Sequence, residues 1–386
     1  MLKIDYINGP KTDKMFGMYK YQMEIQKRLN VVLNVIEYQS IMQNLQKRFN
    51  STDAKLNMYS DEGTSSKFKD SMVDISRKSI QSIDRYRYRT IVKRNVHHGN
   101  VKHITNQELA YLLKYLDLEK TIVTCHDLIP WAYEKNHSKI WKDNMDGIKK
   151  AKQIITISQF SKSEIIKYLD YPEERIHIIS DAVDHEFYKP NRDRTILKKF
   201  KISDNDKVVL YVGSETPRMN LDFLLKSLSK LKKIFPNFKL IKIGEPQSFG
   251  ARNHFLNSII EMGLEENVIF VGYVAEEELP KWYNASDLLV YPCLYAGFGL
   301  PPLEAMACGT PVITSNTTSL PEVVGDAGIM VDPDDEEAMT KSIYKVLTDQ
   351  DLTDDLIKKG LKRSKLFNWE ESAKNTLKVY NLVSDI

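Results

Sequence analysis

The sequence predicts an α/β protein with two doubly wound domains, each built on a parallel sheet. Short apolar runs rich in β-branched residues alternate with longer amphipathic stretches along the chain. That alternation is typical of βαβ units and parallel sheets. The chain has 386 residues, and at roughly 100–200 residues per domain this length predicts two domains.

In the first half, apolar runs predict strands at residues 2–7, 31–35, 121–125, 153–157 and 176–179. Helical patterns separate some of them, at residues 18–29, 106–116 and 161–169. Residues 46–89 are polar and poorly patterned, so we expect helical insertions or loops there.

The composition changes around residues 188–203, a polar stretch that contains Pro190. We therefore place a linker near residue 190, between a first domain of residues 1–190 and a second of residues 191–366. Six further strands are predicted in the second, at residues 208–212, 238–243, 267–271, 288–291, 310–314 and 328–331. The final segment, 367–386, carries an amphipathic helix that either caps the second domain or crosses back to the first.

Composition excludes several classes of protein. The formal net charge is only +3, which argues against a general nucleic-acid binder. The three cysteines lie far apart, without a Cys/His cluster, so neither a disulfide framework nor a structural zinc site is expected. No window approaches the ~20 apolar residues of a membrane span, and no secretory signal pattern opens the chain. We expect a cytoplasmic location.

The densest chemical signal is YAGFGLPPLEAMACGTPVITS, residues 295–315. Gly297 and Gly299 follow a predicted strand, and Pro301 suits the first turn of the helix that comes next. Backbone amides and the helix dipole at such a turn favour an anion such as a diphosphate. Glu304, within the first turns, is placed to accept hydrogen bonds from sugar hydroxyls. A tight strand–helix turn with a capping glutamate would show the same pattern.

Several motifs, in order along most of the chain, resemble the family 4 retaining glycosyltransferases. In the second half they are VGSETPRMNLDFLLKSL, GYVAEEELPKWYNASDLLVYP, GFGLPPLEAMACGTPVI and SLPEVVGDAGIMVDP. The first half and the end of the chain resemble the family through FGMYKYQMEIQKRL, VTCHDLIP, ITISQFSKSEI and FNWEESAKNTLKVY. The resemblance implies the GT-B fold, in which two Rossmann-like domains face a cleft. It places the nucleotide-sugar donor mainly on the second domain and the acceptor mainly on the first.

Site residues follow from the matching motif positions. The resemblance implies that Glu304 holds the ribose hydroxyls, that Arg218 neutralises the leaving phosphate, and that His126 lines the sugar pocket. We expect these three to be the catalytic residues. The donor-binding residues implied are Gly17, Gly213, Ser214, Arg218, Tyr273, Val274, Ala296, Gly297, Phe298, Gly299, Leu300 and Glu304. Because positive side chains and amides stabilise the diphosphate in this family, we expect no metal and no cofactor.

Two hallmark positions depart from the family pattern. Ala296 occupies the place of a glutamate that touches the transferred sugar, and Met219 replaces a lysine beside the diphosphate. Losing a preorganised charge at a developing anion costs on the order of 3 kcal/mol. The leading interpretation is a retaining transferase that moves a hexose from a UDP- or GDP-sugar to a glycan or lipid-linked glycan. Alternatives are a catalytically impaired or non-catalytic nucleotide-sugar binder and a nucleotide-sugar 2-epimerase.

A basic run interleaved with tyrosines, RYRYRTIVKRN, lies in the first domain. Its cations are Arg85, Arg87, Arg89, Lys93 and Arg94. A solvated face with snorkelling side chains is the ordinary interpretation. The sharper one is peripheral association with the inner face of a membrane, which would suit a lipid-linked acceptor.

Overall fold

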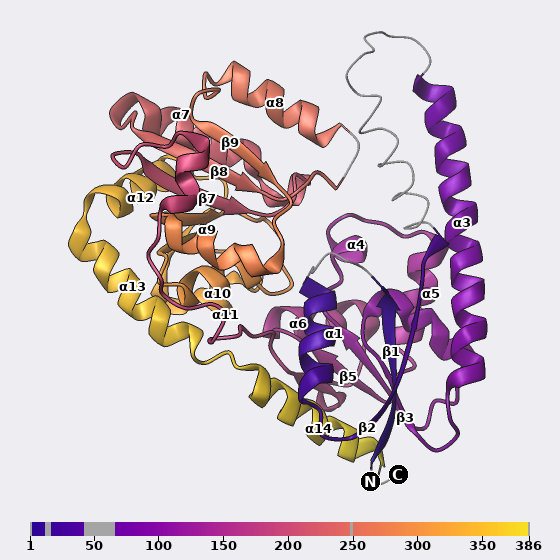
Figure 1. The fold of residues 1–386 in the computed structure, drawn as a ribbon. Helices are drawn as coiled ribbons and strands as arrows, with labels where there is room; N and C mark the ends of the chain where they lie inside the picture. Colours follow the sequence, from indigo (N-terminus) through magenta and orange to yellow (C-terminus); the bar gives the residue numbers. More distant parts are fainter. Residues whose placement is uncertain (1, 12–16, 42–65, 248–249, 385–386) are drawn as a thin grey trace.

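The computed structural model describes residues 2–11, 17–41, 66–247 and 250–384. In this part of the chain, twelve strands form two sheets of six (Figure 1). Every pairing within the sheets is parallel. The predicted α/β fold of two doubly wound domains is therefore confirmed.

The first sheet has the strand order β2-β1-β3-β4-β5-β6. Its strands are β1 (Lys3–Pro10), β2 (Val32–Tyr38), β3 (Val101–Ile104), β4 (Thr121–Cys125), β5 (Gln153–Thr156) and β6 (Ile176–Ile178). The accompanying helices are α1 (Gly17–Arg28), α3 (Ser66–Asn95), α4 (Ile129–Ala132), α5 (Lys139–Ile148) and α6 (Gln159–Leu169), with 3₁₀ segments η1 (Gln107–Tyr115) and η2 (Glu173–Arg175). The direction of strand progression reverses between β1 and β3.

The second sheet has the order β12-β11-β10-β7-β8-β9 and reverses between β10 and β7. Its strands are β7 (Lys207–Val212), β8 (Phe238–Ile243), β9 (Val268–Gly272), β10 (Leu288–Tyr291), β11 (Val312–Ser315) and β12 (Ile329–Val331). Its helices are α7 (Leu221–Ile234), α8 (Ala251–Glu261), α9 (Leu279–Ala285), α10 (Leu300–Ala307), α11 (Leu320–Val324), α12 (Glu336–Thr348) and α13 (Gln350–Ser364). The 3₁₀ segments are η3 (Thr195–Phe200), η4 (Pro217–Met219), η5 (Glu276–Glu278) and η6 (Gly325–Ala327).

Strands covered on both faces by helices read as continuous apolar runs rather than as alternating ones. β10, with the sequence LLVY, and β4, with TIVTC, are buried along their whole length. The run-based predictions for these two strands and for β8 therefore match the observed bounds. β3 escaped prediction because it is four residues long and carries Lys102 and His103, although both are buried.

After β6 the chain begins to contact the second domain just beyond residue 190. The amide of Asn191 donates to Asn284 Oδ1 at 2.6 Å, and Arg192 and Arg194 both pair with Asp287. These contacts fix the polar stretch to α9 and to the start of β10.

The last helix, α14 (Trp369–Ser384), crosses back and packs on the first domain, where it runs beside α1 (Figure 1). The Tyr380 hydroxyl lies 2.7 Å from His103 Nδ1, and Glu370 pairs with Arg28 at 2.7 Å. Ser372 donates to the carbonyl of Ser180 at 2.8 Å. Of the two arrangements that the sequence left open, the structure shows the crossing.

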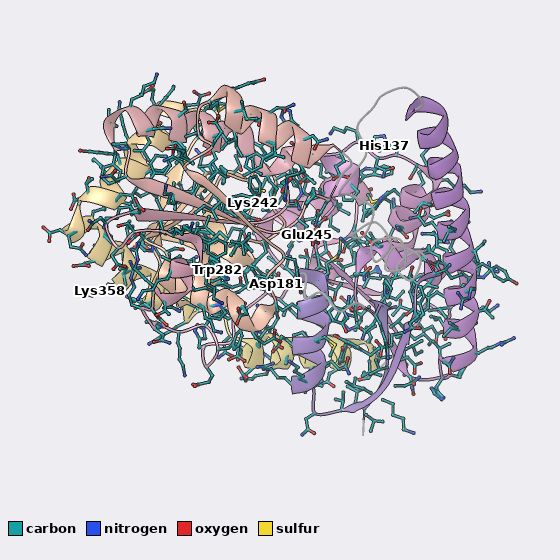
Figure 2. All side chains as sticks on the ribbon, turned by 45° about the horizontal axis from the view of Figure 1, so that its top comes forward. His137, Asp181, Lys242, Glu245, Trp282 and Lys358 are labelled. Atoms are coloured by element: carbon teal, nitrogen blue, oxygen red, sulfur yellow. The ribbon has the colours of Figure 1, made fainter. Side chains whose placement is uncertain are left out.

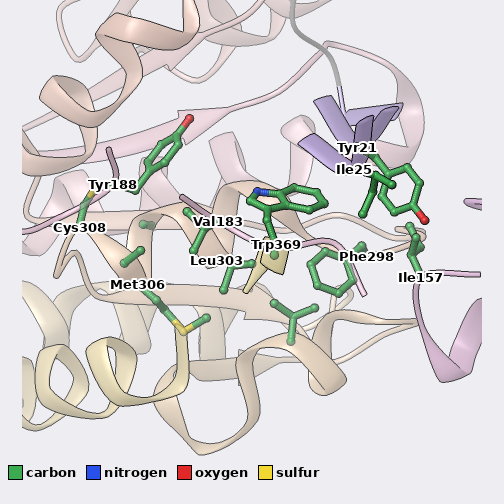
Figure 3. Close-up of a cluster of buried hydrophobic side chains, with 14 of the residues drawn as sticks. Tyr21, Ile25, Ile157, Val183, Tyr188, Phe298, Leu303, Met306, Cys308 and Trp369 are labelled. Carbon is green, nitrogen blue, oxygen red and sulfur yellow. The ribbon is translucent and has the colours of Figure 1, made fainter. Parts of the chain in front are cut away.

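Apolar side chains from both domains and from α14 form one continuous cluster (Figure 3). Tyr21 comes from the first domain, Phe298 and Leu303 come from the second, and Trp369 of α14 lies among them. Burial of this cluster favours the arrangement of the two domains that the structure shows.

The stretch predicted as insertions or loops lies partly outside the described residues. From residue 66 onward it is helical, since α3 is a single helix of 30 residues along the edge of the first domain (Figure 1). Residues 106–116, predicted as an α-helix, contain 3₁₀ turns instead, which begin where Asn106 Oδ1 accepts the amide of Glu108.

Candidate active site

A cleft of about 600 Å³ opens between the two domains. Its walls are loops at the carboxyl ends of the strands, including those next to the reversal points of both sheets. Ligands of open α/β sheets bind at this position. All the sequence-predicted site residues line the cleft: Gly17, His126, Gly213, Ser214, Arg218, Tyr273, Val274, Ala296, Gly297, Phe298, Gly299, Leu300 and Glu304. The structure thus brings the whole set together, while the role of each stays a prediction.

The glycine turn before α10 is fixed by contacts with the first domain. A Cβ on Gly297 would lie 2.8 Å from the carbonyl oxygen of His126, so a side chain there would require the turn or the facing backbone to shift. Ser158 donates from Oγ to the Gly297 carbonyl at 2.8 Å. Gly299 has φ of 144°, a conformation that favours glycine.

Two helix N-termini meet in the cleft. Gly17 is the first residue of α1, and Leu300 is the first of α10. A Cβ on Gly17 would lie 3.4 Å from Leu300 Cδ1, so the two ends are in close contact across the domain boundary. Each N-terminus carries unpaired amides and about half a positive charge. Their combined field favours an anion at this point.

Arg218 adds a full positive charge near the same turn. Its Nη1 donates to the carbonyl oxygen of Tyr295 at 3.2 Å, which leaves other guanidinium hydrogens directed away from this bond. Among the described residues, the hydrogen-bond partners of this guanidinium are a carbonyl oxygen and two sulfur atoms, and no carboxylate pairs with it. Arg218 can therefore bind an anionic ligand without first breaking an ion pair.

His126 is buried and neutral. Its Nε2 lies 3.1 Å from the carbonyl oxygen of Thr105, so this nitrogen carries the proton and Nδ1 is the acceptor. Burial lowers the pKa of His126 to about 4. A hydroxyl could donate to Nδ1, but a ring with this pKa is a poor proton donor near neutrality.

Glu304 is already engaged by protein groups. Its Oε1 accepts Lys20 Nζ of α1 at 2.7 Å, and its Oε2 accepts the Tyr283 hydroxyl at 2.8 Å. Lys20 also pairs with Glu276 at 2.6 Å. Burial opposes the charge of Lys20, but the two carboxylates outweigh it, so the pKa of Lys20 is raised. Lys20 thus forms a buried ionic bridge between the domains.

Sequence reasoning missed Lys20, the cationic partner of Glu304, and Glu276, which shares that lysine. Lys20 follows Gly17 by three residues, one helical turn along α1, and this spacing could have placed it near the cleft. Glu276 belongs to the acidic run EEE, which reads as a solvated surface.

The two departures from the family pattern lie in one buried apolar cluster. Met219 and Ala296 both belong to it, together with Tyr211, Tyr291 and Cys293. Met219 Sδ lies 3.7 Å from Cys293 Sγ. A lysine at position 219 would be a second cation beside Arg218 in these apolar surroundings. Met219 is therefore consistent with its apolar neighbours.

Two aspartates of the first domain also line the cleft and were not predicted. Asp181 lies where the domains meet (Figure 2), and its Oδ1 is buried without a hydrogen-bond partner in the described part of the chain. Burial raises the pKa of Asp181 to about 7. Asp127 follows His126 directly. The described residues contain no group of three or more His, Cys, Asp or Glu side chains able to hold a metal ion.

Family models match both halves of the chain. The model described as glycosyl transferases group 1 matches residues 192–363, and that of glycosyltransferase family 4 matches residues 85–187. O-antigen chain mannosyltransferase B of Escherichia coli is 36% identical over 69% of this chain and 71% of that protein. The chain belongs to the group 1 glycosyltransferases of family 4 and is a glycosyltransferase.

Other similar proteins agree with this family and fold. The serotype-specific mannosyltransferase WbdA of Escherichia coli is 32% identical over 66% of this chain, which spans only 32% of WbdA. HepE of Anabaena, solved in complex with UDP-glucose, superposes with a TM-score of 0.74 at 16% identity, covering 98% of this chain and 100% of HepE. Sucrose-phosphate synthase of Thermosynechococcus elongatus gives a TM-score of 0.64 at 24% identity over 74% of each chain. These structural matches establish the GT-B fold.

Proposed function

We propose that this glycosyltransferase moves a hexose from a UDP- or GDP-sugar to a hydroxyl of a glycan or lipid-linked glycan, with retention of anomeric configuration. One observation carries the proposal: the N-termini of α1 and α10 meet beside Arg218 in a cleft between two domains. Donors and dipoles aimed at one point are what a departing diphosphate requires.

Glu304 would keep acceptor positions for the donor ribose while Lys20 stays in place. A carboxylate has about four acceptor positions, and Lys20 and Tyr283 occupy two of them. The ribose hydroxyls would use the others. The base would then lie toward Tyr273 and Val274, which line the same cleft.

For the chemical step, we propose attack on the face from which the diphosphate leaves. Arg218 and the amides of residues 297–300 would stabilise the charge that develops on the leaving group, and we expect no requirement for a metal. The leaving phosphate would take the proton of the acceptor hydroxyl. His126 would accept a hydrogen bond from a sugar hydroxyl through Nδ1. Its low pKa makes it a poor general acid.

Mannose is the first donor sugar to test, because mannosyltransferases are among the similar proteins at 36% and 32% identity. UDP-glucose is the second, because HepE was solved with it. The O-antigen chain named in the first relative points to a glycan acceptor.

Membrane association through the basic run is a separate proposal. Arg87 is exposed, and so are Lys93, Arg94 and the apolar side chains of Ile83 and Tyr86 on the same helix. Within the described residues no helix has the length and apolar character needed to cross a membrane. Co-sedimentation with vesicles of anionic and of neutral lipid would test binding at the surface.

The first experiment is a thermal-shift panel of UDP, GDP, ADP and their sugar conjugates, each with and without Mg²⁺. A ligand at 100 times its Kd stabilises the folded state by about 2.7 kcal/mol, which raises the melting temperature measurably. We expect one base to respond, without Mg²⁺. A shift that is lost in Glu304→Ala and kept in the exposed Lys345→Ala would support the ribose assignment.

Turnover is the second measurement. Arg218→Gln should lower kcat about 100-fold, the usual cost of losing one preorganised charge, while the melting temperature stays near that of the parent. NMR of the product reports whether the anomeric configuration is retained. Absence of any nucleotide shift would count against the donor site. Binding without turnover would favour the non-catalytic interpretation.

A further inference from the structure

Asp127 places a carboxylate of the first domain against the glycine turn of the second. It follows His126 after β4 and lines the cleft. A Cβ on Gly297 would lie 2.9 Å from Asp127 Cβ and 3.6 Å from its Oδ2. The carboxylate is therefore adjacent to the turn that contains Ala296 and leads into α10.

The two oxygens of this carboxylate have different surroundings. Oδ1 accepts the backbone N–H of Ile129 at 3.0 Å, which fixes the side chain at the start of α4. Oδ2 has no hydrogen-bond or ion-pair partner among the described residues, although it borders the cleft. One oxygen thus orients the group, and the other is available to a ligand.

Burial raises the pKa of the Asp127 carboxyl above its ordinary value, and Glu134 adds to that shift. The N–H of Ile129 and the positive charge of Arg218 act in the opposite direction and favour the charged form. Arg218 lies on the second domain and Asp127 on the first, so a cation and an anion face the same part of the cleft. A diphosphate would bind the cation, whereas the anion suits a group that donates hydrogen bonds.

Covalent connectivity then fixes what Asp127 can meet. In a nucleotide sugar the hexose is bonded to the outer phosphate. If Arg218 and the N-termini of α1 and α10 hold the diphosphate, the hexose lies next to these groups, beside Gly297. Its hydroxyls are neutral donors, and a carboxylate is a strong acceptor for them.

We propose that Asp127 binds a hydroxyl of the transferred hexose through Oδ2 and thereby selects the donor sugar. This inference rests on the proposed function. It means that the sugar-binding carboxylate comes from the first domain, while position 296 of the second carries only a methyl group. Donor recognition then requires both domains in contact, because Asp127 reaches the turn only across their boundary.

The test is a cycle that combines Asp127→Asn with donors lacking single hydroxyls. GDP-mannose and UDP-glucose are compared with their 2-, 3-, 4- and 6-deoxy forms, and release of the nucleoside diphosphate gives kcat/KM. Asparagine keeps an oxygen for the Ile129 amide but loses the charge. We expect Asp127→Asn to lower kcat/KM at least 10-fold on the intact donor and to leave the Kd for the free nucleoside diphosphate within twofold. The exposed Asp146→Asn on α5 is the matched control.

One deoxy donor should react about equally with the parent and with Asp127→Asn, because the hydroxyl that Asp127 binds is missing in both cases. If Asp127→Asn lowered kcat/KM by the same factor on every deoxy donor, the inference would be overturned. It would also be overturned if the Kd for the nucleoside diphosphate rose by as large a factor as kcat/KM fell. A parent chain that binds neither GDP nor UDP and consumes neither donor would instead overturn the proposed function, and the inference with it.

Discussion

The two domains share one architecture but satisfy their buried charges differently. In the second, Lys242 pairs with Glu215 at 2.6 Å, and both lie within that domain. In the first, Lys20 finds its carboxylates in the second domain, and His103 finds Tyr380 in the last helix. The second domain thus contains a complete buried ion pair of its own, whereas the buried cation of the first domain has both of its carboxylates across the domain boundary. Changes to those distant partners should therefore weaken the first domain.

The largest effect should come from Trp369→Ala. This side chain is 1% exposed, packs near the Tyr21 ring of α1 and lies in the shared cluster. Truncating a buried tryptophan costs about 4 kcal/mol. Hydrogen exchange by mass spectrometry should show faster exchange in β3 and β4 than in the parent, with β7 and β8 little changed. Leu366→Ala, at a position 70% exposed, is the control. Loss of protection in β7 and β8 alone would contradict the comparison.

Removal of the interdomain cation ranks next. Lys20→Met leaves Glu276 and Glu304 buried without their shared partner, which should cost about 3 kcal/mol. Lys242→Met is the matched change in the second domain, and it should cost less because Arg252 still pairs with Glu215 at 2.5 Å. Urea unfolding compares the two variants. If Lys242→Met were the more damaging, the ion pair within the second domain would contribute more to stability than the bridge between the domains.

The pH dependence of stability should come from the first domain. His103 and His126 have folded pKa values of about 3 and about 4, against about 6.5 when unfolded, because burial disfavours their charged forms. Between pH 6.5 and 4 the unfolded chain therefore binds more protons, and each histidine lowers stability as pH falls. Asp181 has the opposite effect on stability. Burial raises its pKa from 3.8 to about 7, so between these pH values the folded state holds a proton that the unfolded state has lost, and stability rises as pH falls.

These three groups together predict a loss of about 1 kcal/mol on acidification from pH 6 to 5. His103→Gln should remove one histidine contribution and so reduce the measured slope by about that amount. Urea unfolding at pH 7, 6 and 5 gives both slopes. Identical slopes in parent and variant would mean that His103 is not the neutral, buried group described above.

The smallest effects should come from the basic run. The Arg85 guanidinium lies 3.6 Å from the centre of the Tyr111 ring and 3.7 Å from Asp143, so Arg85→Ala should cost about 1 kcal/mol. Arg87 is exposed, and its ion pair with Asp84 is long, at 4.0 Å. Arg87→Ala should therefore change stability by less than about 0.5 kcal/mol. Thermal unfolding ranks the two. Equal costs would show that Arg85 gains nothing from its ring contact.

The same difference between domains explains how far sequence could predict the fold. In the second domain every observed strand coincides with a predicted apolar run, because both faces of that sheet are covered by helices of the same domain. In the first domain β3 was missed, since His103 looks like a surface residue until Tyr380, 277 positions away, becomes its partner. For α3 the sequence left two alternatives open, helical insertions or loops, because polar side chains obscure its helical period.

The cleft shows the same limit. Motifs located the glycine turn, Arg218 and Glu304, because each lies in a contiguous sequence with local turn chemistry. They did not reveal Lys20 or Asp127 as partners of those groups, since such contacts cross the domain boundary and no local pattern encodes them. Residues that act within one loop are predictable from sequence, and residues that act between domains require coordinates.

The return of α14 to the first domain has a consequence for synthesis of the chain. A ribosome releases residues 2–178, which contain all six described strands of the first sheet, well before Trp369 and Tyr380 leave the exit tunnel. Until then Tyr21 and His103 lack their final partners, while the second domain already has every strand of its sheet. Domains generally fold from the N-terminus onward during synthesis. In this chain we expect the opposite order: the first domain is synthesised first but completes its folding last.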